Sequence, residues 1–221
     1  NYAPSISVDT FGAIGDGTTD DTTAIQLALT HCSTNALTCV LETGKSYRIT
    51  NKLYLWGRAN LWSWRTSSTE FGALAFDTGS IVQQVNFGIS ANFAPEEPWS
   101  GTIKNIGISI LGSSIVAPSS GRTLYFWRVD GGVIDGVVAN FGAYIYSLST
   151  SGNNGAILSS ADCIRKNITF RNNKVTATAT SVGSEGIGLG SWDGALIENN
   201  EILGVGDDVI GIHYSRNIVI R

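Results

Sequence analysis

The chain contains little charge, little proline and no methionine. Of its 221 residues, 14% are charged, four are proline and two are histidine, and the formal net charge is −4. No basic stripe of the kind that binds nucleic acid is present, so nucleic acid is not an expected partner. No run of apolar residues approaches the length of a membrane-spanning helix, so a membrane is not expected as a partner either.

Glycine, by contrast, is abundant, and apolar residues make up a large share of the chain. Glycine occurs 26 times and 43% of the residues are apolar. Weakly charged sequences rich in glycine, serine, threonine and asparagine are typical of all-β proteins with many turns. Ile25 and Leu29 belong to one segment with helical spacing, which predicts a short helix near residues 21–31. No linker divides the chain, so residues 1–221 are predicted to form a single domain.

The three cysteines bear on the cellular location of the protein. Cys32 and Cys39 flank a short polar segment after the predicted helix, and we predict that they form a disulfide, as closely spaced cysteines do in secreted proteins. Cys163 is left over and is expected to be a small buried apolar residue. The predicted disulfide favours an extracellular location.

The second half of the chain repeats itself. Residues 184–189 align with residues 207–212 at an offset of 23, and residues 171–175 align with residues 198–202 at an offset of 27. Offsets in the twenties with short apolar triplets indicate stacked β-coils, that is, a solenoid. The outer two residues of each triplet are expected to face the core. The asparagine pairs in the second repeat are expected at bends, with their amides stacked in a ladder.

The N-terminal segment, residues 11–26, places Gly12, Gly15 and Gly17 among small and acidic residues before the predicted helix. It resembles a motif of the pectate-lyase-like superfamily, whose members mostly bind or cleave polysaccharides. The resemblance implies an all-β fold, a single-stranded right-handed parallel β-helix whose open N-terminal end is capped by the short helix. The three aspartates of this segment are predicted to be structural, because they lie in turns and at the start of a helix.

A candidate catalytic cluster follows from the offset of 23. This offset stacks Glu185 on Asp208, and Asp207 adds a third carboxylate. Adjacent strands lie about 4.8 Å apart, so two carboxyl groups on neighbouring coils can approach to the separations used by glycosidases. Crowded carboxylates raise one another's pKa, which provides one acid and one base near neutral pH.

The cluster also resembles a known motif. Gly206, Asp207 and Asp208 precede an apolar triplet, as in the paired-aspartate motif of the polygalacturonase family of glycoside hydrolases, which implies that both aspartates are catalytic. Glu185 takes the place of the acid that this family has on the preceding coil. The chain departs from the family by having Ser184 before Glu185, where the family has Asn-x-Asp, and by lacking the later Gly-His-Gly and Arg-x-Lys motifs. The alternative is that both aspartates form turns and that Glu185 is merely solvated.

Four further residues are candidates for the same site. His213 is expected to point outward, where it could donate a proton or bind substrate. Arg216 is a candidate for binding substrate, and its alternative is a surface ion pair with Asp193 on the preceding coil. Trp192 and Trp127 are predicted to stack on sugar rings in a groove, with core packing as the alternative.

The sequence leads to two functions of different class. The first is a glycoside hydrolase that cleaves a polysaccharide without a cofactor or metal, either secreted or as a homotrimeric phage tailspike on the virion surface. A polysaccharide lyase or epimerase is its variant and would need calcium or a base beside Arg or Lys. The second is a non-catalytic glycan-binding or structural β-helix, such as an adhesin or a tailspike stalk. Because Arg221 falls within a predicted strand, we expect the chain to be the N-terminal part of a longer β-helix.

Overall fold

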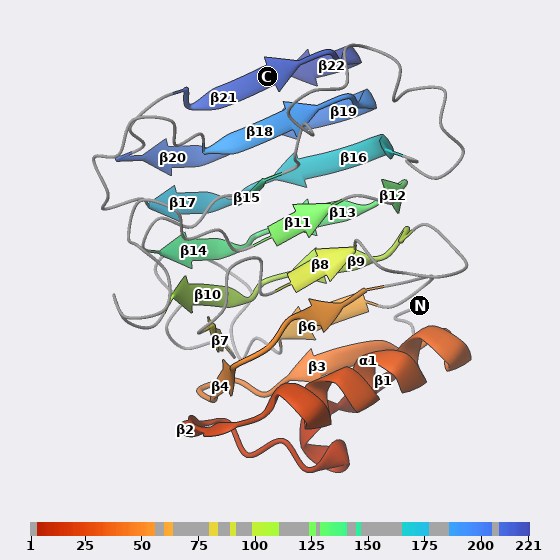
Figure 1. Cartoon of the computed structure of the whole chain (residues 1–221), viewed down its shortest axis with the longest axis vertical. Coiled ribbons are helices and arrows are strands. Elements are labelled where there is room, and N and C mark those ends of the chain that lie inside the picture. Colours follow the sequence, from red (N-terminus) through yellow and green to blue (C-terminus); the bar gives the residue numbers. More distant parts are fainter. Residues whose placement is uncertain are drawn as a thin grey trace.

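The computed structural model describes the chain in segments that together trace a stack of short parallel strands (Figure 1). These segments are residues 4–55, 60–63, 80–83, 89–91, 99–110, 124–126, 129–140, 145–146, 165–176, 186–204 and 208–221. The described strands form three parallel sheets, and after the first turn each turn of the solenoid contributes a strand to each sheet in succession. The fold is therefore mostly β with parallel sheets and little helix, as the repeats predict.

The first sheet runs the whole length of the stack. Its strands are, in spatial order, β1 (Ser5–Ser7), β3 (Thr38–Leu41), β6 (Asn60–Ser63), β9 (Thr102–Lys104), β13 (Val133–Asp135), β16 (Arg165–Arg171), β19 (Asp193–Glu198) and β22 (Arg216–Ile220), with β12 (Val129–Asp130) paired to β16.

The other two sheets complete each coil. The second contains β2 (Asp16–Asp20), β4 (Ser46–Ile49), β7 (Ser80–Gln83), β10 (Gly107–Ile110), β14 (Val138–Asn140), β17 (Lys174–Thr176) and β20 (Glu201–Leu203). The third contains β5 (Leu53–Tyr54), β8 (Ile89–Ala91), β11 (Leu124–Phe126), β15 (Ile145–Tyr146), β18 (Ile187–Gly190) and β21 (Ile210–His213).

The bends between the first and second sheets need a left-handed backbone, which asparagine and glycine tolerate better than other residues. Asn105, Gly136, Asn172 and Asn199 occupy this position on successive described coils, with φ between 53° and 67°. The predicted bends at the asparagine pairs are thus confirmed. The residue after each of these positions turns inward. In the two asparagine pairs this residue is itself asparagine, and its amide bonds to a neighbouring coil. The Asn173 side chain donates to the Oδ1 atom of Asn200 at 2.9 Å and to the Ile134 carbonyl at 3.1 Å.

The core fills the space between the three sheets with stacked apolar side chains. The predicted register is confirmed, because Ile187 pairs with Ile210 and Leu189 with Ile212. Larger rings fill the middle of the stack, where Trp99 and Phe126 stack with their ring centroids 5.5 Å apart, and Phe126 meets Phe170 edge to face at 6.3 Å.

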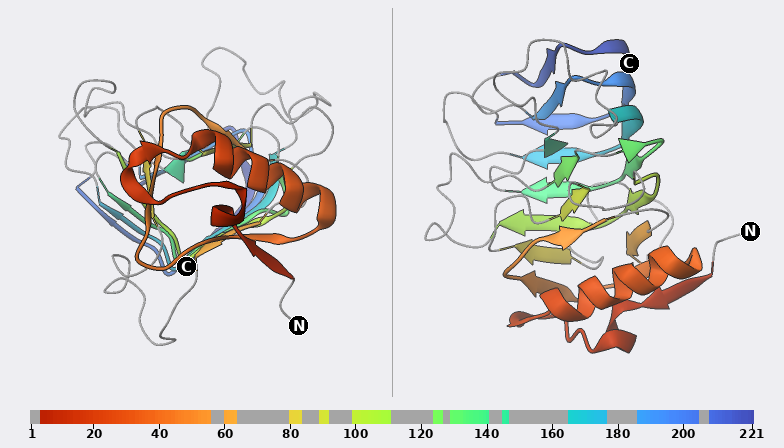
Figure 2. Two further views of the ribbon diagram at one scale, coloured as in Figure 1. Left: turned by 90° about the horizontal axis from the view of Figure 1, so that it is seen from below. Right: turned by 45° about the vertical axis from the view of Figure 1, so that its right-hand side comes forward.

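The N-terminal end carries the helices of the described chain, the short 3₁₀ helix η1 (Val8–Phe11) and the helix α1 (Thr22–Asn35), which lies across that end of the stack (Figure 2). The helix ends four residues later than predicted. It ends where Ala36 adopts a left-handed conformation and donates its backbone N–H to the Cys32 carbonyl. Ile25, Ala28 and Leu29 are buried against the core. No helix among the described residues is long and apolar enough to cross a membrane.

A disulfide joins α1 to the first sheet. Cys32 lies in the last turns of α1 and Cys39 in β3, and the structure bonds the two with their Cα atoms 6.1 Å apart. Both residues are buried. Because the helix is longer than predicted, Cys32 lies inside it and not in the loop that follows. Cys163 lies outside the described residues.

Candidate functional site

The candidate site lies on the last two coils of the third sheet. Strand β18 pairs with β21 in parallel, and the pairing continues towards the strand starts. There the Gly186 N–H donates to the Asp208 carbonyl at 3.1 Å, and the Ile187 N–H donates to the Val209 carbonyl at the same distance. The 23-residue offset that motivates the site is therefore the register of the backbone at this point.

Of the predicted catalytic residues, Asp208 and His213 are in the described chain, and both are exposed. Asp208 precedes β21 by two residues, whereas His213 is the last residue of β21. An extended chain rises about 3.3 Å per residue, which separates the two positions by at most roughly 16 Å. Their side chains are thus placed to meet different parts of a long ligand and not the same atom.

Three predicted residues lie outside the described chain. Glu185, Asp207 and Trp127 fall in segments whose placement the structure does not describe. The predicted carboxylate cluster is therefore represented in the described part of the chain by Asp208 alone.

The expectation for Trp192 is wrong. Its side chain is 0% exposed and belongs to the core, so the ring cannot stack on a bound sugar. The cause is the bend before it, because Ser191 adopts a left-handed conformation with φ 60° and the residue after such a bend turns inward. The Trp192 backbone N–H donates to the Ser215 Oγ atom of the next coil at 3.0 Å, which ties this bend to the coil that follows.

Arg216 forms the ion pair that was its alternative interpretation. Its guanidinium lies 2.6 Å from a carboxylate oxygen of Asp193, and Asn217 donates its amide to the other oxygen at 2.7 Å. These hydrogen bonds hold the pKa of the Asp193 carboxyl below its usual value, and the carboxylate raises the pKa of Arg216. Because the pair is largely exposed, its contribution to stability is small.

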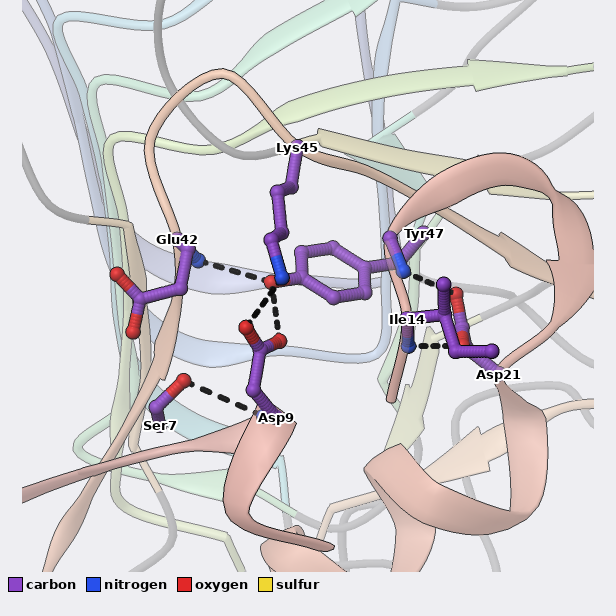
Figure 3. A network of polar contacts seen from close by, with 8 residues as sticks. Ser7, Asp9, Ile14, Asp21, Glu42, Lys45 and Tyr47 are labelled. Carbon is purple, nitrogen blue, oxygen red and sulfur yellow. Dashed lines mark hydrogen bonds and ion pairs between the residues drawn. The ribbon is translucent and has the colours of Figure 1, made fainter. Parts of the chain in front are cut away.

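A polar network that sequence patterns did not predict lies at the other end of the molecule (Figure 3). The Tyr47 hydroxyl donates to Asp9 at 2.8 Å and accepts the Glu42 backbone N–H at 3.1 Å, and the Lys45 ammonium pairs with the same aspartate. Burial raises the pKa of the Tyr47 phenol well above its usual value, and the charge of Asp9 adds to this effect. Tyr47 is fully buried, whereas the Lys45 and Asp9 side chains are 39% and 29% exposed. The network joins η1 to the first complete coil.

The aspartates of the N-terminal motif are structural, as predicted. Asp21 is buried and accepts the backbone N–H groups of Ile14 and Gly15 at 2.7 and 3.1 Å. Asp16 and Asp20 accept hydrogen bonds from nearby threonines, which hold the pKa of each carboxyl below its usual value. Among the described residues no group of three or more His, Cys, Asp or Glu side chains is placed to hold a metal ion.

Comparison with solved structures identifies the fold. A candidate glycosyl hydrolase from Parabacteroides merdae superposes with a TM-score of 0.62 at 17% identity, over 98% of this chain and 93% of that chain. The A-module of a mannuronan C-5 epimerase from Azotobacter vinelandii superposes with a TM-score of 0.57 at 16% identity, over 88% of this chain and 50% of that chain. The chain has the parallel β-helix fold of these solved structures.

The same β-helix fold occurs in a phage protein. The pre-mature form of gene product 12 of bacteriophage phi29 superposes with a TM-score of 0.52 at 15% identity, over 98% of this chain and 32% of that chain. The chain thus spans about half of the epimerase module and about a third of the phage protein. No family model matches the sequence, and no curated protein matches it significantly.

Proposed function

We propose that this β-helix acts on a polysaccharide as a glycoside hydrolase whose acid and base come from Glu185, Asp207 and Asp208. The observation that carries the proposal is the backbone register, in which Gly186 donates to the Asp208 carbonyl. This register pairs the coil that starts after Glu185 with the coil that starts after the two aspartates. The structural neighbours include a carbohydrate epimerase and a candidate glycosyl hydrolase, which supports the proposal that this chain acts on a polysaccharide.

The proposed chemistry divides two roles among the carboxylates. One protonated carboxyl gives its proton to the glycosidic oxygen, and one ionised carboxylate either activates water or attacks the sugar directly. His213 lies about five residues further along the same extended segment, and we infer that it binds a neighbouring sugar unit. Stacking on a sugar ring is assigned to Trp127. Arg216 forms an ion pair with Asp193. If Arg216 also binds the polysaccharide, it must contact the substrate while it keeps this ion pair.

The setting that we infer is outside the cell or on a virion surface. The disulfide between Cys32 and Cys39 supports it, because such bonds persist in oxidising compartments. We also infer that the coils are right-handed, as nearly all parallel crossover connections are, and that α1 caps the N-terminal end. A phage tailspike of this kind would be a homotrimer, which sedimentation of the purified chain can test.

The alternative functions can be told apart by their effect on a polysaccharide. A lyase or epimerase is favoured by the epimerase among the structural neighbours. A lyase would leave an unsaturated sugar with an ultraviolet absorbance, and an epimerase would change the sugar composition without shortening the chain. A non-catalytic glycan-binding or structural β-helix would do neither.

The decisive experiment measures new reducing ends on a panel of neutral and acidic polysaccharides. We expect Asp208→Asn to lower turnover by about a hundredfold or more on the substrate that the parent chain cleaves. Glu201→Gln is the matched control, because Glu201 is an exposed carboxylate whose ion pair with Lys174 lies on the second sheet. Full activity of Asp208→Asn would contradict the proposed site, and the absence of cleavage on every substrate would favour the binding or structural function.

A further inference from the structure

One short sequence motif plays no part in the proposed function. Asn167, Ile168 and Thr169 form the one Asn-x-Thr or Asn-x-Ser triplet among the 221 residues, and its middle residue is not proline. Such a triplet is the acceptor for oligosaccharide transfer to asparagine in secreted proteins. The triplet alone carries little weight, because short motifs recur by chance. The fold decides whether the asparagine can carry a sugar.

Strand β16 presents both polar residues of the triplet on the outer face of the first sheet. Asn167 adopts a left-handed conformation with φ 54°, which interrupts the alternation of inward and outward side chains. Lys166 and Asn167 are therefore both exposed, Ile168 is buried, and Thr169 is partly exposed again. Burial thus falls on the middle residue, whose side chain the acceptor motif leaves free.

The amide group of Asn167 is oriented with its nitrogen towards the preceding coil. The Nδ2 atom donates to the Asp130 Oδ1 atom at 3.0 Å, and this bond uses one of the two amide hydrogens. The amide oxygen lies over the following coil, because a Cβ atom built on Gly194 would be only 2.8 Å from the Asn167 Oδ1 atom. The nitrogen, which is the atom that would carry a sugar, thus points away from Gly194.

Glycine occupies the position beside Asn167 on both neighbouring coils. The strand register sets Gly131 on one side and Gly194 on the other. Apart from its chain neighbours, no described atom lies within 4 Å of the point that a Cβ atom of Gly131 would occupy. Space is therefore open on the side towards which the Asn167 nitrogen points.

We propose that Asn167 carries an N-linked oligosaccharide, a modification that does not depend on the proposed hydrolase activity. The donor is a lipid-linked oligosaccharide pyrophosphate of the secretory compartment. A bond forms between Nδ2 and C1 of the first sugar, the bond from C1 to the phosphate oxygen breaks, and the lipid pyrophosphate leaves. The amide nitrogen gives one proton to a base of the transferase and keeps the other, which can remain bonded to Asp130. The disulfide between Cys32 and Cys39 supports passage through an oxidising secretory compartment.

The chain contains a matched position without the hydroxyl. Asn217 has a left-handed φ of 58° and donates its amide to the Asp193 Oδ1 atom at 2.7 Å, much as Asn167 donates to the coil before it. Two residues later the chain has Val219 where β16 has Thr169. Exchanging valine and threonine between these two outward positions should therefore move the acceptor motif by two coils, with little change in side-chain volume.

The test expresses the chain behind a signal sequence in mammalian cells and measures the intact mass of the secreted protein before and after treatment with peptide N-glycosidase. We expect the parent chain to carry one glycan that this enzyme removes, leaving aspartate in place of Asn167. Asn167→Gln and Thr169→Val should each lack the glycan, whereas Thr169→Ser should keep it. Thr169→Val combined with Val219→Thr should carry the glycan on Asn217.

The folded state is checked on the same samples. The glycosylated parent should have the disulfide between Cys32 and Cys39 intact, and its circular dichroism spectrum should match that of the enzymatically deglycosylated chain. The proposal is overturned if the secreted parent chain carries no glycan or if Asn167→Gln retains one. It is also overturned if the glycan is found only on molecules whose Cys32 and Cys39 are unpaired, because the fold would then exclude the modification.

Discussion

The two ends of the described stack of strands bury the same kind of residue to very different extents. At the N-terminal end, α1 lies over the stack, and Ile25, Leu29 and Leu53 are essentially inaccessible to solvent. At the C-terminal end, Ile220 occupies an inward position of the same architecture and remains half exposed. Coil geometry decides which way a side chain points, whereas burial depends on whether another layer covers it. The two ends should therefore differ in what each residue contributes to stability.

The largest difference is expected for two isoleucines in register. Ile197 and Ile220 pair across β19 and β22, but the first is 2% exposed. Ile197→Ala should destabilise the fold by about 2–5 kcal/mol, because it removes buried methyl groups and leaves a cavity. Ile220→Ala should cost less than about 1 kcal/mol, in line with surface substitutions. Urea unfolding of the two variants measures both values, and equal losses would mean that the C-terminal end is covered in solution.

The disulfide should matter next. Reducing it, or replacing Cys32 and Cys39 by alanine, frees the link between α1 and β3. Such a short loop is worth about 2–3 kcal/mol in the chain-entropy view. The loss should be concentrated at the N-terminal end, so hydrogen exchange should rise in α1 while the amides of β18 and β19 keep their protection. Faster exchange spread evenly over the stack would show that the two ends unfold as one unit.

The polar network around Tyr47 at the N-terminal end should have a smaller effect. Tyr47→Phe leaves Asp9 and the Glu42 backbone N–H without the hydroxyl that both contact. The expected loss is about 0.5–1.5 kcal/mol, the usual net contribution of a hydrogen bond, because Asp9 keeps its ion pair with Lys45 and is partly exposed. Tyr214→Phe is the control from the opposite end, because Tyr214 is exposed and should show no change. Thermal unfolding of both variants checks the difference.

The smallest effect concerns the ion pair at the C-terminal end. Hydrogen bonds from Arg216 and then Asn217 lower the pKa of Asp193. A carboxyl whose folded pKa lies below its unfolded value, near 3.9, stabilises the fold above that value. This contribution is lost as the pH falls through the folded pKa. Arg216→Gln should raise the pKa of Asp193 towards its ordinary value in an NMR titration, with a smaller rise in Asn217→Ala. An unchanged titration would mean that the pair is not formed in solution.

Much of the C-terminal half could be predicted because its repeats are local in sequence. The offset of 23 between Ile187 and Ile210 is also their register, and the bends at Asn172 and Asn199 follow from the residue type. The burial of Trp192 could not be read from alternation, because the left-handed Ser191 breaks the alternation just before it.

The N-terminal network was beyond sequence reasoning for a different reason. Asp9 meets Lys45 and Tyr47 across 36 and 38 positions, and it lies in η1, which belongs to no repeat. No spacing rule connects these residues until the first coil is closed. For the candidate site, the sequence predicted the register around Asp208, whereas the positions of Glu185 and Asp207 lie outside the described residues.

Acidic and basic residues alternate between neighbouring strands of the first sheet, where Asp130 pairs with Lys166, and Asp193 pairs with Lys166 on one side and with Arg216 on the other. This alternation restricts how such a solenoid can change its length. Removing the single coil that contains β19 would place Lys166 beside Arg216 and Arg171 beside Arg221, and would stack Asn167 on Asn217. Removing two consecutive coils would keep every opposite-charge neighbour. On this face, the unit of insertion or deletion that keeps opposite charges side by side is therefore a pair of coils.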